Sequence, residues 1–143
     1  MILDKTHKSR LESKEINSRG ESRPIVGITF LDKNKYGLKD LYEAYRGDKN
    51  YVKQLNDFLE KARSYGTLTE LIDNHTPKSN MKNTDDESNK KMVQIQNEHC
   101  IETSDMCHLH CCRDGKGSFV LHGFFIGNCF EIVWLDAKHK VHK

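Results

Sequence analysis

The stretch that decides the fold is CHLHCCRDGKGSFVLHGFFIGNCFEIVWLDAKHKVH, residues 107–142. It contains the only Trp, four of the six Phe, four of the five Cys and five of the eight His, so the side chains best suited to a core and to chemistry coincide. We therefore expect the core and any functional site to lie in the same part of the molecule.

Two apolar runs within this stretch, residues 118–126 and 129–135, are separated only by Gly127 and Asn128. Both residues tolerate the positive φ of a two-residue turn, so the pattern predicts a β-hairpin. If Ile126 pairs with Cys129, His122 lies opposite Val133. The more apolar face of the hairpin is then the core face, carrying Phe119, Leu121, Phe125, Phe130, Ile132 and Trp134. His122 and Glu131 occupy the other face, toward solvent or a cleft.

A preceding strand is predicted over residues 107–112, but the loop that joins it to the hairpin is ambiguous. A three-residue loop, 115–117, places His110 opposite His122 and puts both on one sheet face with His108. A four-residue loop, 114–117, shifts the pairing by one residue, so that His122 lies opposite Leu109. The sequence leaves both registers open.

Upstream, residues 1–22 lack a sustained apolar period and are predicted to be a disordered or marginally helical extension of a single domain, residues 23–143. A short β-branched run predicts a strand at 23–31. Helical spacing and capping signals predict helices near residues 38–47, 48–66, 67–72 and 85–98. The polar residues 76–91 are predicted to be a flexible insertion that leads into the fourth helix.

This order of elements predicts an α+β fold. The N-terminal strand and the helices are expected to pack on one face of a small antiparallel C-terminal sheet.

Composition restricts the classes of protein. Charged residues make up 31% and the formal net charge is +2, too small by itself to indicate a nucleic-acid partner. No run approaches the ~20 apolar residues of a membrane span. The odd number of Cys and the absence of a secretory leader predict reduced thiols and a soluble, cytoplasmic protein without a membrane partner.

The predicted order of elements resembles the RelE/ParE superfamily of small bacterial toxins over residues 23–142. The ending WLDAKHKVH, residues 134–142, resembles the close of HigB- and YafQ-type members, in which a strand delivers an acidic residue and a His to the active cleft. The N-terminal extension, the insertion at 76–91 and the scarcity of Arg in the sheet depart from the family pattern.

The resemblance implies endonucleolytic cleavage of mRNA by attack of the ribose 2′-OH, often on the ribosome, and an antitoxin protein as partner. His suits the acid and base because its ordinary pKa of ~6.5 lies near working pH. The implied base and acid are His122 and His110, with His139 as the next acid, and Asp136 or Glu131 orients an imidazole. The implied phosphate contacts are Arg113, Lys116 and Lys138. This reaction calls for no cofactor.

Two other functions stay open on the residues alone. In the three-residue-loop register, His108, His110 and His122 would share a sheet face and could hold a metal ion, with water activation as one outcome. The second alternative is a non-catalytic regulatory or phage-defence interaction protein, in which the sheet is only a scaffold.

Overall fold

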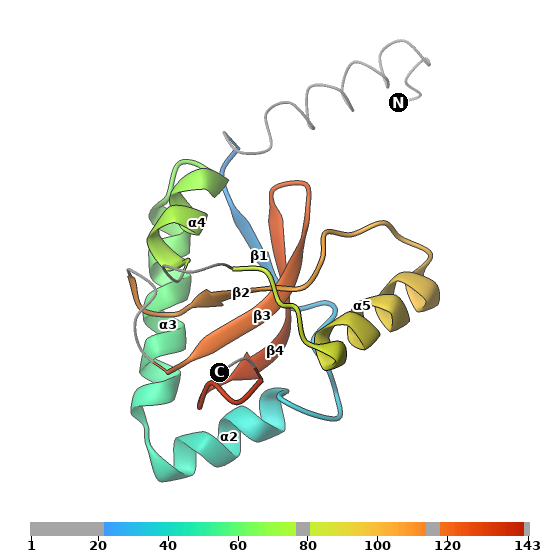
Figure 1. The fold of residues 1–143 in the computed structure, drawn as a ribbon. Coiled ribbons are helices and arrows are strands. Elements are labelled where there is room, and N and C mark those ends of the chain that lie inside the picture. Colours follow the sequence, from blue (N-terminus) through green and yellow to red (C-terminus); the bar gives the residue numbers. More distant parts are fainter. Residues whose placement is uncertain (1–21, 77–80, 114–117, 142–143) are drawn as a thin grey trace, which may run out of the picture.

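The structure, a computed structural model, describes residues 22–76, 81–113 and 118–141. These residues form one four-stranded sheet and four helices (Figure 1). The elements in chain order are β1 (Ile25–Gly27), α2 (Leu38–Gly47), α3 (Asn50–Ser64), α4 (Leu68–His75), α5 (Asp86–His99), β2 (Cys107–His110), β3 (Val120–Ile126) and β4 (Cys129–Asp136). The α+β class predicted from the sequence is confirmed. The predicted N-terminal extension, up to residue 21, lies outside the described residues.

The sheet has the order β1-β4-β3-β2 and is mixed. β1 pairs parallel to β4, with Val26 opposite Phe130, whereas β2, β3 and β4 are antiparallel to one another. The antiparallel pairing predicted for the three C-terminal strands is confirmed, but the N-terminal strand joins the edge of the sheet in parallel and does not pack on its face. A parallel neighbour needs a long crossover, and the helices α2 to α5 lie within the chain that separates β1 from β4.

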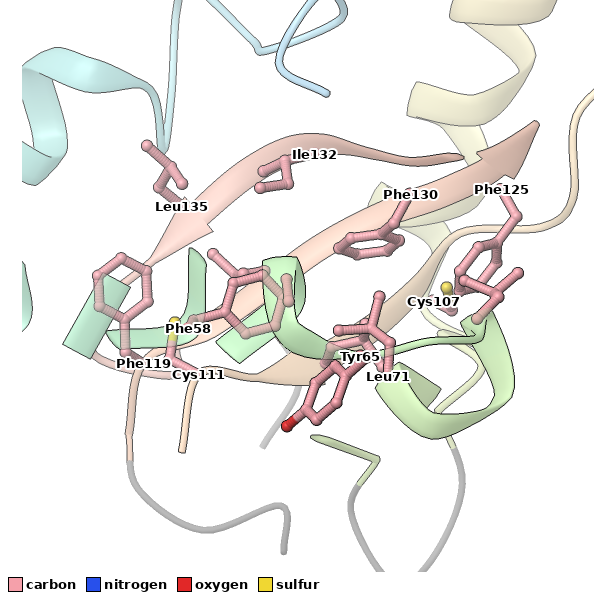
Figure 2. Close-up of a cluster of buried hydrophobic side chains, with 14 of the residues drawn as sticks. Phe58, Tyr65, Leu71, Cys107, Cys111, Phe119, Phe125, Phe130, Ile132 and Leu135 are labelled. Atoms are coloured by element: carbon pink, nitrogen blue, oxygen red, sulfur yellow. The ribbon is translucent and has the colours of Figure 1, made fainter. Parts of the chain in front are cut away.

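Helices cover both faces of the sheet, which corrects the expectation that they all pack on one. Leu41, Phe58 and Leu71 of α2, α3 and α4 join the larger core cluster with Leu121 and Phe130 (Figure 2). On the opposite face, a second cluster consists of Met92 and Ile95 of α5 with Met106, Phe124, Val133 and Trp134. The second face was predicted to look toward solvent or a cleft, but its aromatic residues need a helix of their own to exclude water.

A β-bulge explains why the second face is apolar. Ile126 pairs with Cys129 as predicted, but the register shifts between His122 and Gly123, so His122 lies opposite Trp134 instead of Val133. The extra residue in β4 turns Trp134 from the predicted core face to the α5 face. Trp134 was predicted on the core face with Phe119 and Leu121. That assignment is wrong, because it did not include the bulge.

The pairing of β2 with β3 differs from both predicted registers. His108 lies opposite His122, and His110 lies opposite Val120. The register with a three-residue loop predicted the correct sheet face for all three histidines. It paired His122 with His110 instead of His108, a shift of two residues along β2. Residues 114–117, which would distinguish the loops, lie outside the described residues.

The helix starts follow local capping chemistry. Thr67 Oγ1 accepts from the Glu70 backbone N–H at 3.1 Å, as the capping-box pattern predicts. At α5 the cap is Asp85, the first residue of the predicted range, and its Oδ2 accepts from the Ser88 N–H at 2.9 Å. The structure therefore places the last six residues of the predicted flexible insertion in the first turns of α5.

Two further findings concern the chain as a whole. None of the helices in the described residues is long and apolar enough to cross a membrane. The five cysteines, all of which are described, are free thiols.

Gly123 tests the bulge. An ideal Cβ at this position would lie 2.1 Å from the Glu131 carbonyl oxygen, a contact that no side chain can make without moving the backbone. We expect Gly123→Ala to lower the free energy of unfolding by about 1–3 kcal/mol, the usual cost of overpacking, measured by urea denaturation. Gly47→Ala at the end of α2 is the matched control, because a Cβ at Gly47 would meet nothing within 4 Å. Equal stability of Gly123→Ala and wild type would show that the bulge is not a fixed feature.

Candidate functional site

Four histidine rings gather on the sheet face that α5 covers. His108 and His110 come from β2, His122 from β3, and His139 from the turn after β4. The His108 ring centroid lies 6.0 Å from His110, 5.8 Å from His122 and 6.4 Å from His139, and the His110 and His139 rings meet edge to face at 5.2 Å. His108, His110 and His122 are buried, whereas His139 is half-buried. The cluster therefore meets solvent chiefly through His139.

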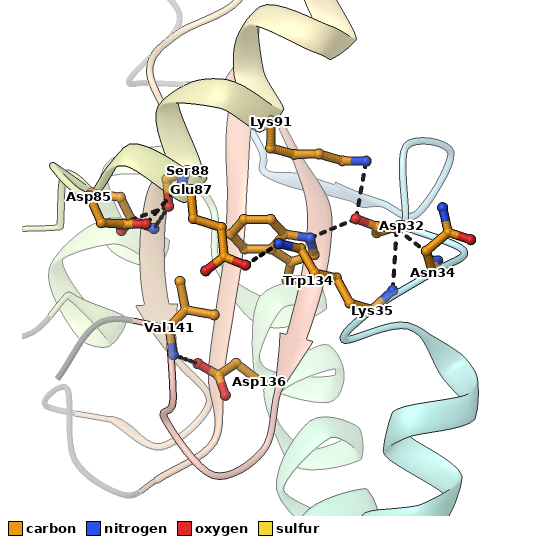
Figure 3. Close-up of polar contacts among 11 residues, drawn as sticks. Asp32, Asn34, Lys35, Asp85, Glu87, Ser88, Lys91, Trp134, Asp136 and Val141 are labelled. Carbon is orange, nitrogen blue, oxygen red and sulfur yellow. Dashed lines mark hydrogen bonds and ion pairs between the residues drawn. The ribbon is translucent and has the colours of Figure 1, made fainter.

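Asp136 fixes the turn that carries His139. Its Oδ1 accepts from the Lys140 backbone N–H and its Oδ2 from the Val141 N–H, both at 2.9 Å (Figure 3). His139 has φ 54°, in the left-handed region, which is uncommon for a residue with a side chain. The Asp136 carboxylate stabilises the turn that holds this conformation and so fixes the position of the His139 ring. Burial raises the pKa of Asp136, but the hydrogen bonds from His122 and the two backbone N–H groups outweigh it and hold the pKa below its ordinary value.

His122 is held at both ring nitrogens. Nε2 lies 3.0 Å from Asp136 Oδ2, and Nδ1 lies 2.9 Å from Asn83 Nδ2. The side chain is fully buried and packs against Trp134 at 5.9 Å between ring centroids. His122 therefore supports the cluster from inside and has no nitrogen available for a substrate in this arrangement.

The same contacts bear on the alternative metal site. A metal ligand at His122 would need a ring nitrogen with an uncommitted lone pair, yet Asp136 and Asn83 occupy both nitrogens. Among residues 22–76, 81–113 and 118–141, no group of three or more His, Cys, Asp or Glu side chains is arranged to hold a metal ion. The proposed set of His108, His110 and His122 thus shares a face without forming a metal site.

Asn83 is the residue that sequence reasoning missed. It was assigned to a flexible insertion, yet it is only 1% exposed and its side chain joins His122, His108 and Ser88. An isolated bridge between Lys82 and Cys107 brings this segment against β2. The only signal in the sequence was its position just before a helix cap, which does not distinguish a buried amide from a solvated one.

Asp32, in the loop between β1 and α2, links both this loop and α5 to the sheet. Its Oδ2 accepts from Trp134 Nε1 at 2.9 Å and pairs with Lys91 Nζ at 3.0 Å, while its Oδ1 accepts from the Asn34 N–H at 2.8 Å (Figure 3). Burial raises the pKa of Asp32, but these donors more than offset it, so the pKa lies below its ordinary value. Asp32 thereby holds the layer that closes over the histidines.

The residues that were predicted to contact phosphate do not lie together in the structure. Lys138 is exposed next to His139, but Arg113 donates to Asn74 Oδ1 from Nε at 3.2 Å and Nη2 at 2.8 Å, which places it against α4. α4 belongs to the layer on the face opposite the histidines. Lys116 lies outside the described residues. Glu131, the other candidate to orient an imidazole, is directed at Gly27 of β1 instead.

A pocket of about 440 Å³ opens beside Asp136 at the end of β4. It lies between the start of α5, through Glu87, and α2, through Asp40 and Glu43. The complete lining is Lys35, Tyr36, Asp40, Glu43, Ala44, Glu87, Leu135, Asp136, Ala137, Lys138 and Lys140. The lining contains three Lys and four Asp or Glu residues, so the pocket can take a polar ligand without a strong preference for net charge.

His75 is a further buried histidine, on the other sheet face, and it contacts the end of β2. Its Nδ1 donates to the His110 carbonyl oxygen at 2.9 Å, and its Nε2 accepts from the Tyr65 hydroxyl at 2.9 Å. Burial lowers the pKa of His75, because the charged imidazolium would lose its hydration. The neutral ring fixes the backbone from which the His110 side chain projects toward the cluster.

The lowered pKa of Asp136 predicts a pH-dependent stability. A carboxylate whose folded pKa is depressed stabilises the fold above its unfolded pKa of ~3.9, and this contribution is lost as pH falls through the folded pKa. We expect Asp136→Asn to lose roughly 1.5–3 kcal/mol, the contribution of a hydrogen bond to a charged group, between pH 5 and 7. The difference from wild type should shrink below about pH 4 in urea titrations.

Asp73→Asn, an exposed carboxylate on α4, is the control and should show no such difference. A gap between wild type and Asp136→Asn that stays constant down to about pH 2 would contradict the ionised, hydrogen-bonded Asp136.

Comparisons with protein-family models, with curated proteins and with solved structures returned no match. The fold and the site therefore have to be interpreted from the residues themselves.

Proposed function

We propose that this chain is an endoribonuclease of the RelE type, in which His139 and His110 form the acid–base pair. The observation that carries the proposal is the edge-to-face contact of the two rings at 5.2 Å, with the His110 ring buried and the His139 ring half-buried. Two imidazoles at this separation can serve the two oxygens on either side of a single phosphorus atom.

The chemistry requires two proton transfers. The base takes the proton of the ribose 2′-OH as its oxygen bonds to phosphorus, and the acid gives a proton to the 5′-oxygen as the P–O5′ bond breaks. The products are a 2′,3′-cyclic phosphate and a 5′-hydroxyl, so no redox partner is needed. Such a positioned acid or base contributes about 10²–10⁴-fold to the rate.

The roles differ from those that the sequence suggested. His122 moves from base to support, because it is fully buried and both nitrogens are engaged. Asp136 keeps its orienting role, but acts on the turn that carries His139 as well as on His122. His139, which the sequence suggested only as the next candidate acid, is here proposed to contact the substrate.

Lys138 and Lys140 are the proposed phosphate contacts. Both side chains are exposed on either side of His139 and line the pocket beside Asp136. An ammonium group there would neutralise charge on the five-coordinate phosphate. The acidic residues across the pocket, Asp40 and Glu43, weaken attraction to long nucleic acid, which favours a partner such as the ribosome to present the RNA.

His139→Asn tests the proposal without disturbing the backbone, because Asn tolerates the positive φ of this position. We expect induced wild-type protein to arrest bacterial growth and to create RNA ends that carry 2′,3′-cyclic phosphates. His139→Asn should reduce the number of these ends by about 10²–10⁴-fold, the usual contribution of one acid or base, and should restore growth.

His99→Asn is the matched control, since His99 is exposed at the end of α5 and contacts Phe30 outside the cluster. It should arrest growth like wild type. Normal growth and unchanged RNA ends with wild-type protein would overturn the proposal, and so would equal cleavage by the His139→Asn protein.

A further inference from the structure

We propose that Asn83 is a positioning residue that fixes which nitrogen of His108 and of His122 carries the proton, through hydrogen bonds that are donated outward from Asn83 toward Asp85 at one end and Asp136 at the other. The hydrogen-bond chain runs Asp85, Ser88, Asn83, His122, Asp136, with His108 branching from Asn83. Its relevance to catalysis rests on the proposed function, whereas the proton positions themselves do not.

Asp136 determines which ring nitrogen of His122 carries the proton. A carboxylate only accepts, and the Asp136 oxygen lies 3.0 Å from His122 Nε2, so Nε2 must carry the proton and donate. In a neutral imidazole the other nitrogen is then the acceptor. His122 Nδ1 therefore accepts from the Asn83 amide N–H, 2.9 Å away.

Asp85 and Ser88 determine the orientation of the Asn83 amide, independently of Asp136. Ser88 has one hydroxyl proton, which it donates to Asp85 Oδ1 at 2.9 Å, so the same oxygen can only accept from Asn83 at 3.0 Å. The Asn83 atom that faces Ser88 and His122 is therefore its nitrogen. Both of its N–H groups are used, and its oxygen points at His108.

His108 follows from these two constraints. The Asn83 oxygen accepts at 2.7 Å from His108 Nδ1, so Nδ1 carries the proton and Nε2 carries the lone pair. His108 touches His110 and His139 at 6.0 and 6.4 Å between ring centroids. Asn83 thus sets the proton position of a ring that lies next to the proposed acid–base pair, although Asn83 itself lies away from the substrate.

The chain also explains the burial of a polar group under α5. Asn83 satisfies all its side-chain hydrogen-bonding atoms, and its backbone N–H donates to the Met106 carbonyl at 2.9 Å. A buried amide that is fully bonded is well ordered, because leaving any one partner unmade costs about 1–3 kcal/mol. Asp85, which caps α5, therefore also fixes Ser88, and through Ser88 the amide that orients the histidines of the sheet.

The first experiment reads the protons directly. Long-range ¹H–¹⁵N correlation spectra of the full ¹⁵N-labelled chain distinguish a protonated ring nitrogen from a bare one. We expect His122 to be protonated at Nε2 and His108 at Nδ1. His75 provides an internal reference, because the His110 carbonyl independently fixes its proton at Nδ1.

Asn83→Asp is the decisive variant, because it keeps the shape but replaces the donating NH₂ by an accepting oxygen. His122 would then face two carboxylates, that of Asp136 and the one introduced at position 83, with His108 as the other ionisable ring against it. Its ring should therefore become protonated at both nitrogens near neutral pH. The His75 signals should not move. Asn83→Leu, which removes every polar atom, should not give a doubly protonated His122.

These outcomes separate the two proposals. A wild-type spectrum with His108 protonated at Nε2, or an unchanged His122 in Asn83→Asp, would overturn the positioning role. If the spectra agree, Asn83→Asp should also shift the pH profile of RNA cleavage and lower its rate within the ~10²–10⁴-fold range of acid–base catalysis. Expected spectra together with no cleavage by wild type would retain the positioning role and reject the ribonuclease.

Discussion

The hydrogen bond between His122 and Asp136 depends on a single extra residue in β4. Without the bulge beside Gly123, Asp136 would lie on the opposite face of the sheet, since side chains alternate along a strand. With it, Asp136 and Trp134 join His122 under α5. One inserted residue thus adds Trp134 to the second core and Asp136 to the polar network, and bulges are common next to functional sites.

The second core and the network stabilise each other. α5 brings Met92 and Ile95 against Trp134, and its N-terminal cap holds Asn83 against the histidines. Asp32 adds a direct link from Lys91 to Trp134. Because a polar group inside such a layer is costly unless it is bonded, the apolar contacts that exclude water also make each hydrogen bond strong and specific.

The network divides the histidines by role. His122 and His75 are fixed at both ring nitrogens, on opposite faces of the sheet, and act as supports. His139 has a left-handed backbone conformation in the turn after β4 and is the only half-buried ring of the four in the cluster. A rigid set of buried rings behind one accessible ring matches the need of acid–base catalysis for preorganised groups.

The sequence by itself determined the local features: the helices near residues 38–47 and 67–72, the cap at Thr67, the two-residue turn after Ile126, and the concentration of chemistry after residue 107. Periodicity and turn residues encode these features, because they depend on neighbours a few positions apart. Only the tertiary structure decided the faces of Trp134 and Asp136, the pairing of His108 with His122, the separation of Arg113 from the cluster and the burial of Asn83. A bulge, a strand register and a buried amide depend on contacts between segments distant in the chain, which no local pattern records.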